Sequence, residues 1–138
     1  LQQRIGRNRV RGRDLNFAFL AAVLSVPAPC TLSATLTTTA APSGGNVTSA
    51  TVTVTVPPGN SGVINFNNFS YSGTLTDQQY SKNGGAFATI AGGSAVTFAN
   101  GDTLAVRGTG MTAGESWTFT LQDNTRQANI GTYTITAS

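Results

Sequence analysis

The side chains of this chain that could perform acid–base chemistry are a few carboxylates in turn-like sequence contexts. A glycosidase needs only two carboxylates, placed on either side of the scissile bond. Here the acidic residues of the chain body lie in the stretches LTDQQ, ANGDT, TAGES and LQDNT. Acidic and amide side chains in such stretches commonly support turns by bonding nearby backbone. We therefore predict turn-supporting roles and no catalytic pair for Asp77, Asp102, Glu115 and Asp123.

The chain contains few residues that could support other catalytic or metal-binding chemistry. The chain contains no histidine and one cysteine, Cys30, which excludes Ser-His and Cys-His dyads and a Cys-based zinc site. Asp102 and Asp123 at predicted strand ends could contribute to a calcium site, but no DxDxDG-type run is present. We predict that the protein is not an enzyme and uses no metal, cofactor or small-molecule substrate. We interpret Cys30 as a small buried apolar residue.

The basic residues are concentrated before residue 15, although the formal net charge is only +3. On an extended chain, arginines at every second position project from one side. Such an arm could lie along an acidic protein groove or a phosphate backbone, and we favour protein subunits over nucleic acid. A solvated tail is the alternative interpretation. The predicted contact residues are Arg4, Arg7, Arg9, Arg11 and Arg13.

An apolar run, LNFAFLAAVLSVPAPC, follows these arginines. Asp14 is suited to cap a short helix through Leu24, which the following prolines would end. Because its side chains are apolar around almost the whole circumference, we predict burial against a partner or lipid. We expect residues 1–30 to be a retained arm that contacts neighbouring subunits. The alternative is a secretory signal or anchor over residues 1–28. The predicted apolar contacts are Phe17, Phe19 and Leu20.

From about Thr31 onward the chain alternates apolar and polar residues in short segments. In SATVTVTV, three valines fall on one face and three threonines on the other. About eight or nine such segments, separated by turn residues, predict an all-β antiparallel sandwich over residues 31–138. The predicted inward sets are Leu32, Ala34 and Leu36; Val52, Val54 and Val56; Ile64 and Phe66; Leu104 and Val106; Trp117, Phe119 and Leu121; and Tyr133 and Ile135.

Two Asn-Gly motifs punctuate these segments, at Asn83-Gly84-Gly85 and Asn100-Gly101-Asp102. Asn and Gly tolerate the positive φ angles of tight hairpins, so we predict a hairpin at each motif. We interpret Lys82 as a solubilising charge on an edge strand. Some aromatic side chains must face away from the core if the strands alternate. Candidate surface contacts are Phe69, Tyr71 and Tyr80.

The stretches YSKNGGAF (80–87), VTFANGDTLAVR (96–107), SWTFTL (116–121) and IGTYTI (130–135) resemble an immunoglobulin-like β-sandwich module. Modules of this kind occur in tailed-phage virion proteins and in bacterial surface proteins. The resemblance covers roughly residues 45–138 and excludes the arm. It implies an immunoglobulin-like sandwich with structural or attachment roles, and it transfers no catalytic residues.

These observations favour a virion structural protein, such as a capsid decoration or a minor head or tail component. Its partners would be protein subunits of the same assembly, present in many copies and including other copies of this chain. Very few residues are charged, 9% of the chain, which suits a protein lodged in an assembly. One alternative is an exported, extracellular surface or filament subunit. Another is a carbohydrate-binding module that uses Tyr71 or Tyr80.

Overall fold

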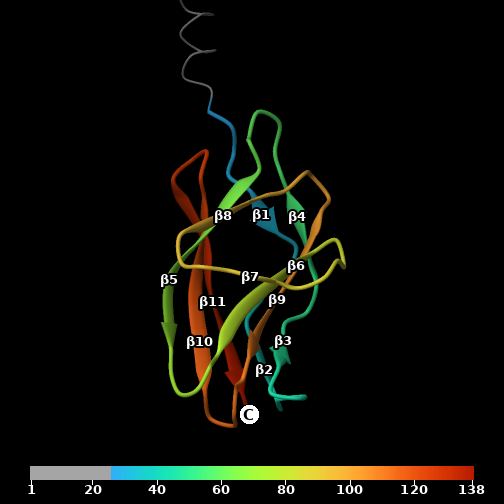
Figure 1. The fold of residues 1–138 in the computed structure, drawn as a ribbon. Helices are drawn as coiled ribbons and strands as arrows, with labels where there is room; N and C mark the ends of the chain where they lie inside the picture. The colour runs from blue at the N-terminus through green and yellow to red at the C-terminus, as the bar shows by residue number, and fades with distance from the viewer. Residues whose placement is uncertain (1–25) are drawn as a thin grey trace, which may run out of the picture.

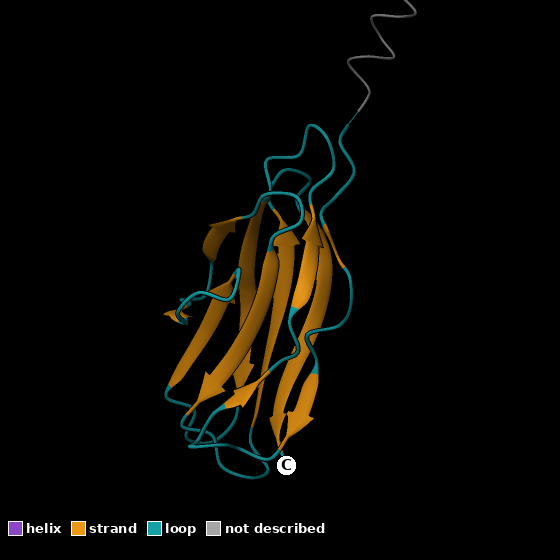
Figure 2. Cartoon of the chain, turned by 90° about the vertical axis from the view of Figure 1, so that its right-hand side faces the viewer, coloured by secondary structure: helices purple, strands orange, loops and turns teal. Residues whose placement is uncertain are grey.

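A computed structural model describes residues 26–138, which form two β-sheets packed face to face (Figures 1 and 2). No helix occurs among these residues, so the expected all-β sandwich is confirmed. One sheet has the order β1-β4-β9-β6-β7, with β3 also on β9, and the other has the order β2-β11-β10-β5-β8. The strands are β1 (Thr31–Leu32), β2 (Thr38–Ala40), β3 (Val47–Thr48), β4 (Val52–Thr55), β5 (Val63–Tyr71), β6 (Asp77–Lys82), β7 (Ala88–Thr89), β8 (Ser94–Thr97), β9 (Thr103–Thr109), β10 (Ser116–Asp123) and β11 (Ala128–Ala137).

The core lies between the sheets and follows the predicted alternation in most strands. Val52 and Val54 are buried, while Thr53 and Thr55 between and after them are exposed. On β10, Trp117 stacks on Phe119 with ring centroids 4.4 Å apart. Burying one large apolar side chain contributes about 1.5–3 kcal/mol, so these rows supply most of the stabilisation. The predicted inward residues that are fully buried are Leu36, Val52, Val54, Ile64, Phe66, Leu104, Val106, Trp117, Phe119, Leu121 and Ile135.

The N-terminal strand changes sheets, and this corrects two sequence-based expectations. β1 pairs with β4, then the chain bends at Ser33 and Ala34 and continues as β2 beside β11. β2 continues in the same direction as β1 and therefore pairs with β11 in parallel. The sandwich is thus not wholly antiparallel. The bend also breaks the predicted face of Leu32, Ala34 and Leu36. Leu36 is buried, whereas Ala34 is exposed.

A β-bulge in β5 reverses the side-chain alternation before Phe69. Thr118 pairs with Ser70 but Thr120 pairs with Asn67, so β5 contains one extra residue at this point. Asn68 adopts φ 54°, a left-handed conformation that Asn tolerates better than most residues. Counting alternate residues from Phe66 would point Phe69 outward. Instead the ring of Phe69 packs edge-on against Trp117, with centroids 5.5 Å apart.

The two Asn-Gly motifs form different turns. The first is the predicted hairpin between β6 and β7, with φ 55° at Asn83 and 70° at Gly84. The second carries the chain from one sheet to the other, because β8 pairs with β5 while β9 pairs with β4 and β6. The predicted second hairpin is therefore wrong. Lys82 is exposed, and its Nζ donates to the carbonyl of Thr97 at 2.9 Å.

Candidate functional site, an open seam between the sheets

The change of sheet by the N-terminal strand leaves a seam open along one side of the sandwich. β1 pairs with β4 on one side only. β2 covers β11 only from Ile135 to Ala137. Over residues 129–134, the edge of β11 that faces away from β10 has no partner strand within the described part of the chain. Two sheet edges therefore face each other across the seam without a strand between them.

The β1 side of the seam presents backbone groups. Ser33 N donates to Thr53 O at 2.9 Å, which directs the backbone of Ser33 toward β4. Successive residues of a strand direct their N–H and C=O groups to opposite sides. The N–H and C=O of Leu32 therefore point away from β4 and toward the seam.

The β11 side is arranged in the same way. Thr134 N donates to Thr37 Oγ1 at 3.2 Å, so its N–H points away from β10. Thr132 lies two residues earlier and directs its backbone to the same side. Its own side chain lies on the outer face, where the hydroxyl bonds with that of Thr120 at 3.0 Å. The N–H and C=O of Thr132 are thus presented to the seam.

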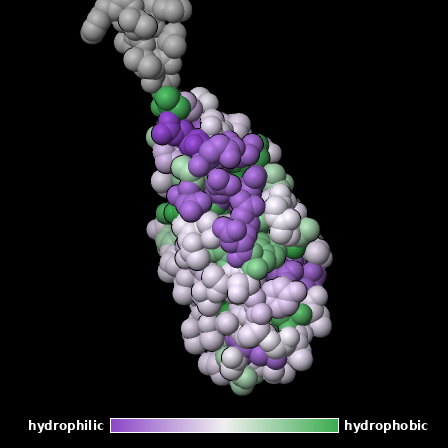
Figure 3. All heavy atoms as spheres, turned by 90° about the vertical axis from the view of Figure 1, so that its left-hand side faces the viewer, coloured by the Kyte–Doolittle hydropathy of each residue, from purple (hydrophilic) through white to green (hydrophobic). Residues whose placement is uncertain are grey.

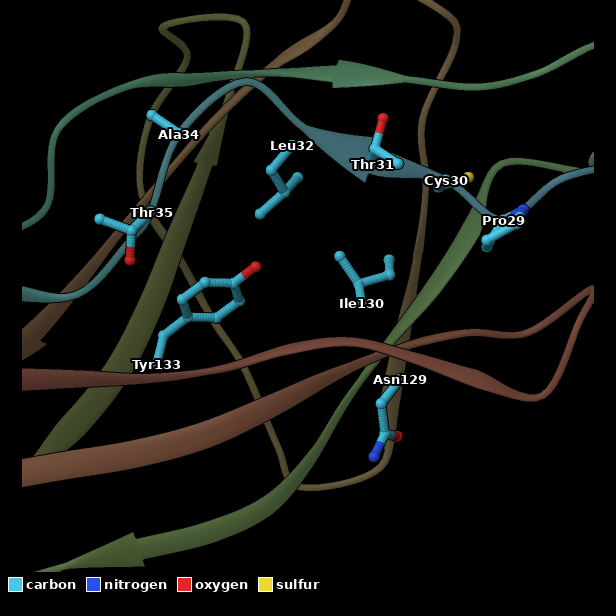
Figure 4. Close-up of a pocket in the computed structure, with 9 residues that line it drawn as sticks. All are labelled: Pro29, Cys30, Thr31, Leu32, Ala34, Thr35, Asn129, Ile130 and Tyr133. Carbon is cyan, nitrogen blue, oxygen red and sulfur yellow. The ribbon is translucent and has the colours of Figure 1, made fainter.

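A cavity of about 440 Å³ lies within the seam (Figure 4). The side chains of Leu32, Ile130 and Tyr133 point toward one another across it, and all three are half-buried and packed against the core. Burial raises the pKa of the Tyr133 phenol. Gly131 allows that ring to lie along β11, because a methyl group there would be 2.5 Å from the Tyr133 hydroxyl. The middle of the seam is therefore apolar and its edges are backbone.

A buried carboxylate fixes the chain where it enters the seam. Asp123 is fully buried, and its Oδ2 accepts from Cys30 N at 2.6 Å and from Asn60 Nδ2 at 2.8 Å. Its Oδ1 accepts from Arg126 N at 2.9 Å. Burial alone would raise the pKa of Asp123, but these donors outweigh it and the pKa is lowered. Asn60 Nδ2 also donates to Ala28 O at 3.0 Å, so the entering segment is held at two points.

Cys30 is buried, as the sequence predicted, and it lines the cavity. Its Sγ lies 3.4 Å from Asn60 Oδ1. Burial, together with the hydrogen bond and negative charge of Asp123, raises the pKa of the thiol to about 12. A thiol of this kind is protonated and unreactive at neutral pH. Its role in the structure is therefore packing.

The remaining carboxylates are also engaged by neighbouring groups. Glu115 accepts from the backbone N–H groups of Thr112 at 3.0 Å and Thr74 at 2.9 Å, which joins two loops. These bonds lower the pKa of Glu115 to about 2. Asp77, at the start of β6, accepts from Thr89 Oγ1 at 2.7 Å across the strands. Within residues 26–138, no group of three or more histidine, cysteine or acidic residues is placed to hold a metal ion.

The predicted aromatic contacts do not form one exposed surface. Tyr71 is 56% exposed. Phe69 packs against Trp117, and the ring of Tyr80 lies 6.0 Å from that of Phe66, so both are half-buried against the core. A carbohydrate platform would therefore have to rely on Tyr71. The predicted arm contacts Arg4, Arg7, Arg9, Arg11, Arg13, Phe17, Phe19 and Leu20 lie outside the described residues.

The outer face of the five-stranded sheet is polar and largely uncharged. Thr118 and Thr134 share a hydroxyl bond of 2.9 Å, and Asn67 donates to Gln122 at 2.9 Å. Figure 3 views the side of the molecule on which β5 lies, and strongly hydrophilic side chains gather toward the end where the described chain begins. These cross-strand bonds hold the face together, and few charges are available there to attract an ionic partner.

The seam could not be found from the sequence, because Leu32 and Tyr133 meet only through the fold. The alternation of Leu32, Ala34 and Leu36 continues unbroken in the sequence, so it gave no signal that the strand leaves its sheet. The part of the chain that the structure describes has no helix suited in length and apolarity to crossing a membrane. Comparisons of the chain with protein-family models, curated proteins and solved structures found no match.

Proposed function

We propose that this chain is a non-enzymatic structural subunit of a multi-copy protein assembly, and that the assembly is a virion. The observation that carries the proposal is the open seam. Exposed strand edges readily pair with another chain, and proteins that act alone usually cover or charge them. Here the edges of β1 and β11 flank a cavity with an apolar middle. Its lining also includes Thr31, Thr35 and Asn129 but no charged side chain. Such a surface suits the binding of another protein segment.

An immunoglobulin-like topology forms part of this proposal. The neighbours β1-β4-β9-β6 correspond to the order A-B-E-D of that fold, and β11-β10-β5 correspond to G-F-C. The short strands β7 and β8 would then be additions between D and E. The buried tryptophan departs from the usual pattern, because Trp117 lies on β10 and not on the strand equivalent to C. Since this fold serves many functions, the argument for assembly depends on the seam.

An exported surface or filament subunit is the second candidate, because the same seam would serve a filament. The two candidates differ in the fate of residues 1–28. The intact mass of the chain recovered from purified particles and from cell-envelope fractions distinguishes them. We expect the arm to be retained in particles. A mature N-terminus near Pro29, found in the envelope fraction, would favour the exported subunit.

The proposal of a multi-copy subunit is tested separately by the mass of the purified full chain in solution. Light scattering after size-exclusion chromatography should detect species larger than the 14.2 kDa monomer. A chain that stays monomeric at every concentration up to the millimolar range would overturn the proposal.

A further inference from the structure

We infer that the seam binds the apolar N-terminal segment of a second copy of this chain as an added β-strand. The inferred strand comprises residues 15–19, LNFAF, and lies between β1 and β11. This inference rests on the proposed function, since it specifies how one subunit would contact the next.

The backbone groups on both sides of the seam suit the binding of an extended chain. Leu32 on one side and Thr132 on the other present backbone N–H and C=O groups to the same gap. A β-strand offers such groups along both of its edges and can pair with both sides at once. A helix uses its own groups internally and would leave the two edges of the seam unpaired. In this site the segment would therefore adopt a strand in place of the helix that the sequence predicts between Asp14 and Leu24.

The apolar middle of the cavity suits large apolar side chains at alternate positions of an added strand. Leu32, Ile130 and Tyr133 converge on it, and its volume of about 440 Å³ falls within the range of ligand pockets, about 300–1,000 Å³. In an extended LNFAF segment, one face carries Leu15, Phe17 and Phe19, while the other carries Asn16 and Ala18.

The apolar face would thus enter the cavity, and the small and polar face would lie toward solvent. The arginines precede this segment and would lie beyond the closed part of the seam, where their charge stays hydrated. No charge would need to be buried.

The course of residues 26–30 favours a segment supplied by another copy (Figure 1). An added strand from any copy could pair with β1 only from Leu32 onward. Before Leu32, two backbone groups on the same edge are already used, because Ala28 O accepts from Asn60 and Cys30 N donates to Asp123. Residues 26–30 leave the sandwich at its upper end in Figure 1. We therefore place the apolar segment of one copy in the seam of the next.

Such an exchange is head-to-tail. Each copy would donate a segment and accept another, so the contact would produce either a closed ring or an open chain of subunits. It follows that one copy lacking a functional segment and one copy lacking a functional seam should complement each other and form a dimer only.

Two variants of the full chain test this. Thr132→Pro removes the N–H that faces the seam but no N–H that pairs with β10, and proline is tolerated at such edge positions. Its control, Thr132→Val, loses the same hydroxyl but keeps the N–H. In the segment, F17D/F19D places carboxylates on the apolar face, and the control N16D/A18D places them on the opposite face.

We expect light scattering to show monomers for Thr132→Pro and for F17D/F19D, and wild-type assemblies for both controls. An equimolar mixture of the two monomeric variants should give a dimer and nothing larger. Assemblies that persist in both variants would overturn the strand exchange but leave the multi-copy subunit standing. A monomeric wild-type chain would overturn both.

Disulfide trapping provides a second test, which does not depend on correct folding of the proline variant. On a Cys30→Ala background, one chain carries Ala34→Cys at the exposed rim of the cavity and another carries Phe17→Cys. Mixed under mild oxidation, they should form a disulfide-linked heterodimer in much greater yield than a pair with Asn124→Cys in place of Ala34→Cys. Equal yields from the two pairs would contradict the inference.

Discussion

Asn83 and Asp102 fasten the two Asn-Gly turns of the molecule to each other. Asn83 Nδ2 donates to Asp102 Oδ1 at 3.0 Å, and Asn83 Oδ1 accepts from Thr103 N at 2.9 Å. The other oxygen of Asp102 accepts from Ala99 N at 2.8 Å, within its own turn. The N–H of Ala99 and the amide of Asn83 lower the pKa of Asp102. The β6–β7 hairpin and the crossing between the sheets are thus held as one unit.

This relationship makes Asn83 sensitive to substitution although it is exposed. Asn83→Ala should destabilise the fold by about 1–2 kcal/mol, because it loses two surface hydrogen bonds and puts alanine at positive φ. Asn83→Gly keeps the backbone conformation and should lose less. Urea denaturation measures both. An alanine variant as stable as wild type would show that neither the turn nor its bonds matter to stability.

Asp123 should be the least replaceable of the carboxylates. Asp123→Asn presents an amide N–H₂ to the donors of Cys30, Asn60 or Arg126, so a buried donor loses its acceptor. We expect a loss of about 2–4 kcal/mol in the free energy of unfolding. The control Asp77→Asn, nearer the surface, should cost less than about 1 kcal/mol. Equal losses in the two variants would contradict this role for Asp123.

Phe69 and Tyr71 should respond differently to truncation, because Phe69 packs against Trp117 whereas Tyr71, the last residue of β5, is largely exposed. Phe69→Ala removes the ring that packs on Trp117 and should cost about 2–4 kcal/mol. Tyr71 is 56% exposed, and Tyr71→Ala should change stability by less than about 1 kcal/mol. Thermal unfolding of both variants checks this. The reverse order would place Phe69 on the surface.

The strands of the sandwich could be predicted where local alternation and burial agree. Val52 and Val54 are buried as expected, since a strand with one face on the core must alternate. The position of Phe69 could not be predicted, because one extra residue at Asn68 reverses every later position of β5. The NN pair at Asn67 and Asn68 was the available signal, as asparagine tolerates left-handed φ.

Pairing between residues far apart in the sequence explains the other features that could not be predicted. The motifs at Asn83 and Asn100 look alike in sequence, yet only the first joins neighbouring strands, because β8 pairs with β5. The seam depends on residues of β1 and β11 that are about 100 positions apart, and no local pattern encodes their approach. The arm remains a prediction, since it lies outside the described residues.

Cys30 should be inert in the folded protein. It is 1% exposed and its pKa is raised to about 12, so neither access nor ionisation favours reaction. At pH 8 the native chain should react with a disulfide reagent such as Ellman's at least about 100-fold more slowly than the chain in urea. Cys30→Ser, which cannot react, gives the background. Rapid labelling of the native chain would mean that the segment over Asp123 opens readily.

Glu115 should give the protein a specific sensitivity to acid. Its pKa is lowered from 4.5 to about 2 by hydrogen bonds from Thr112 and Thr74. A carboxylate with a lowered folded-state pKa stabilises the fold above its unfolded pKa, and this contribution is lost as the pH falls through the folded pKa. The free energy of unfolding should therefore decrease as the pH drops from about 4.5 to about 2.

Glu115→Gln tests the origin of that decrease. The variant should be less stable than wild type at pH 7, and the difference should vanish near pH 2, where wild-type Glu115 is itself being protonated. Glu115→Asp keeps the charge but shortens the reach to Thr74 and Thr112, so it should resemble the glutamine variant. Asp102 and Asp123 also have lowered pKa values, so part of the acid slope should remain in both variants. Denaturation at a series of pH values measures this, and a difference between wild type and Glu115→Gln that stays constant with pH would show that the hydrogen bonds do not depend on the charge.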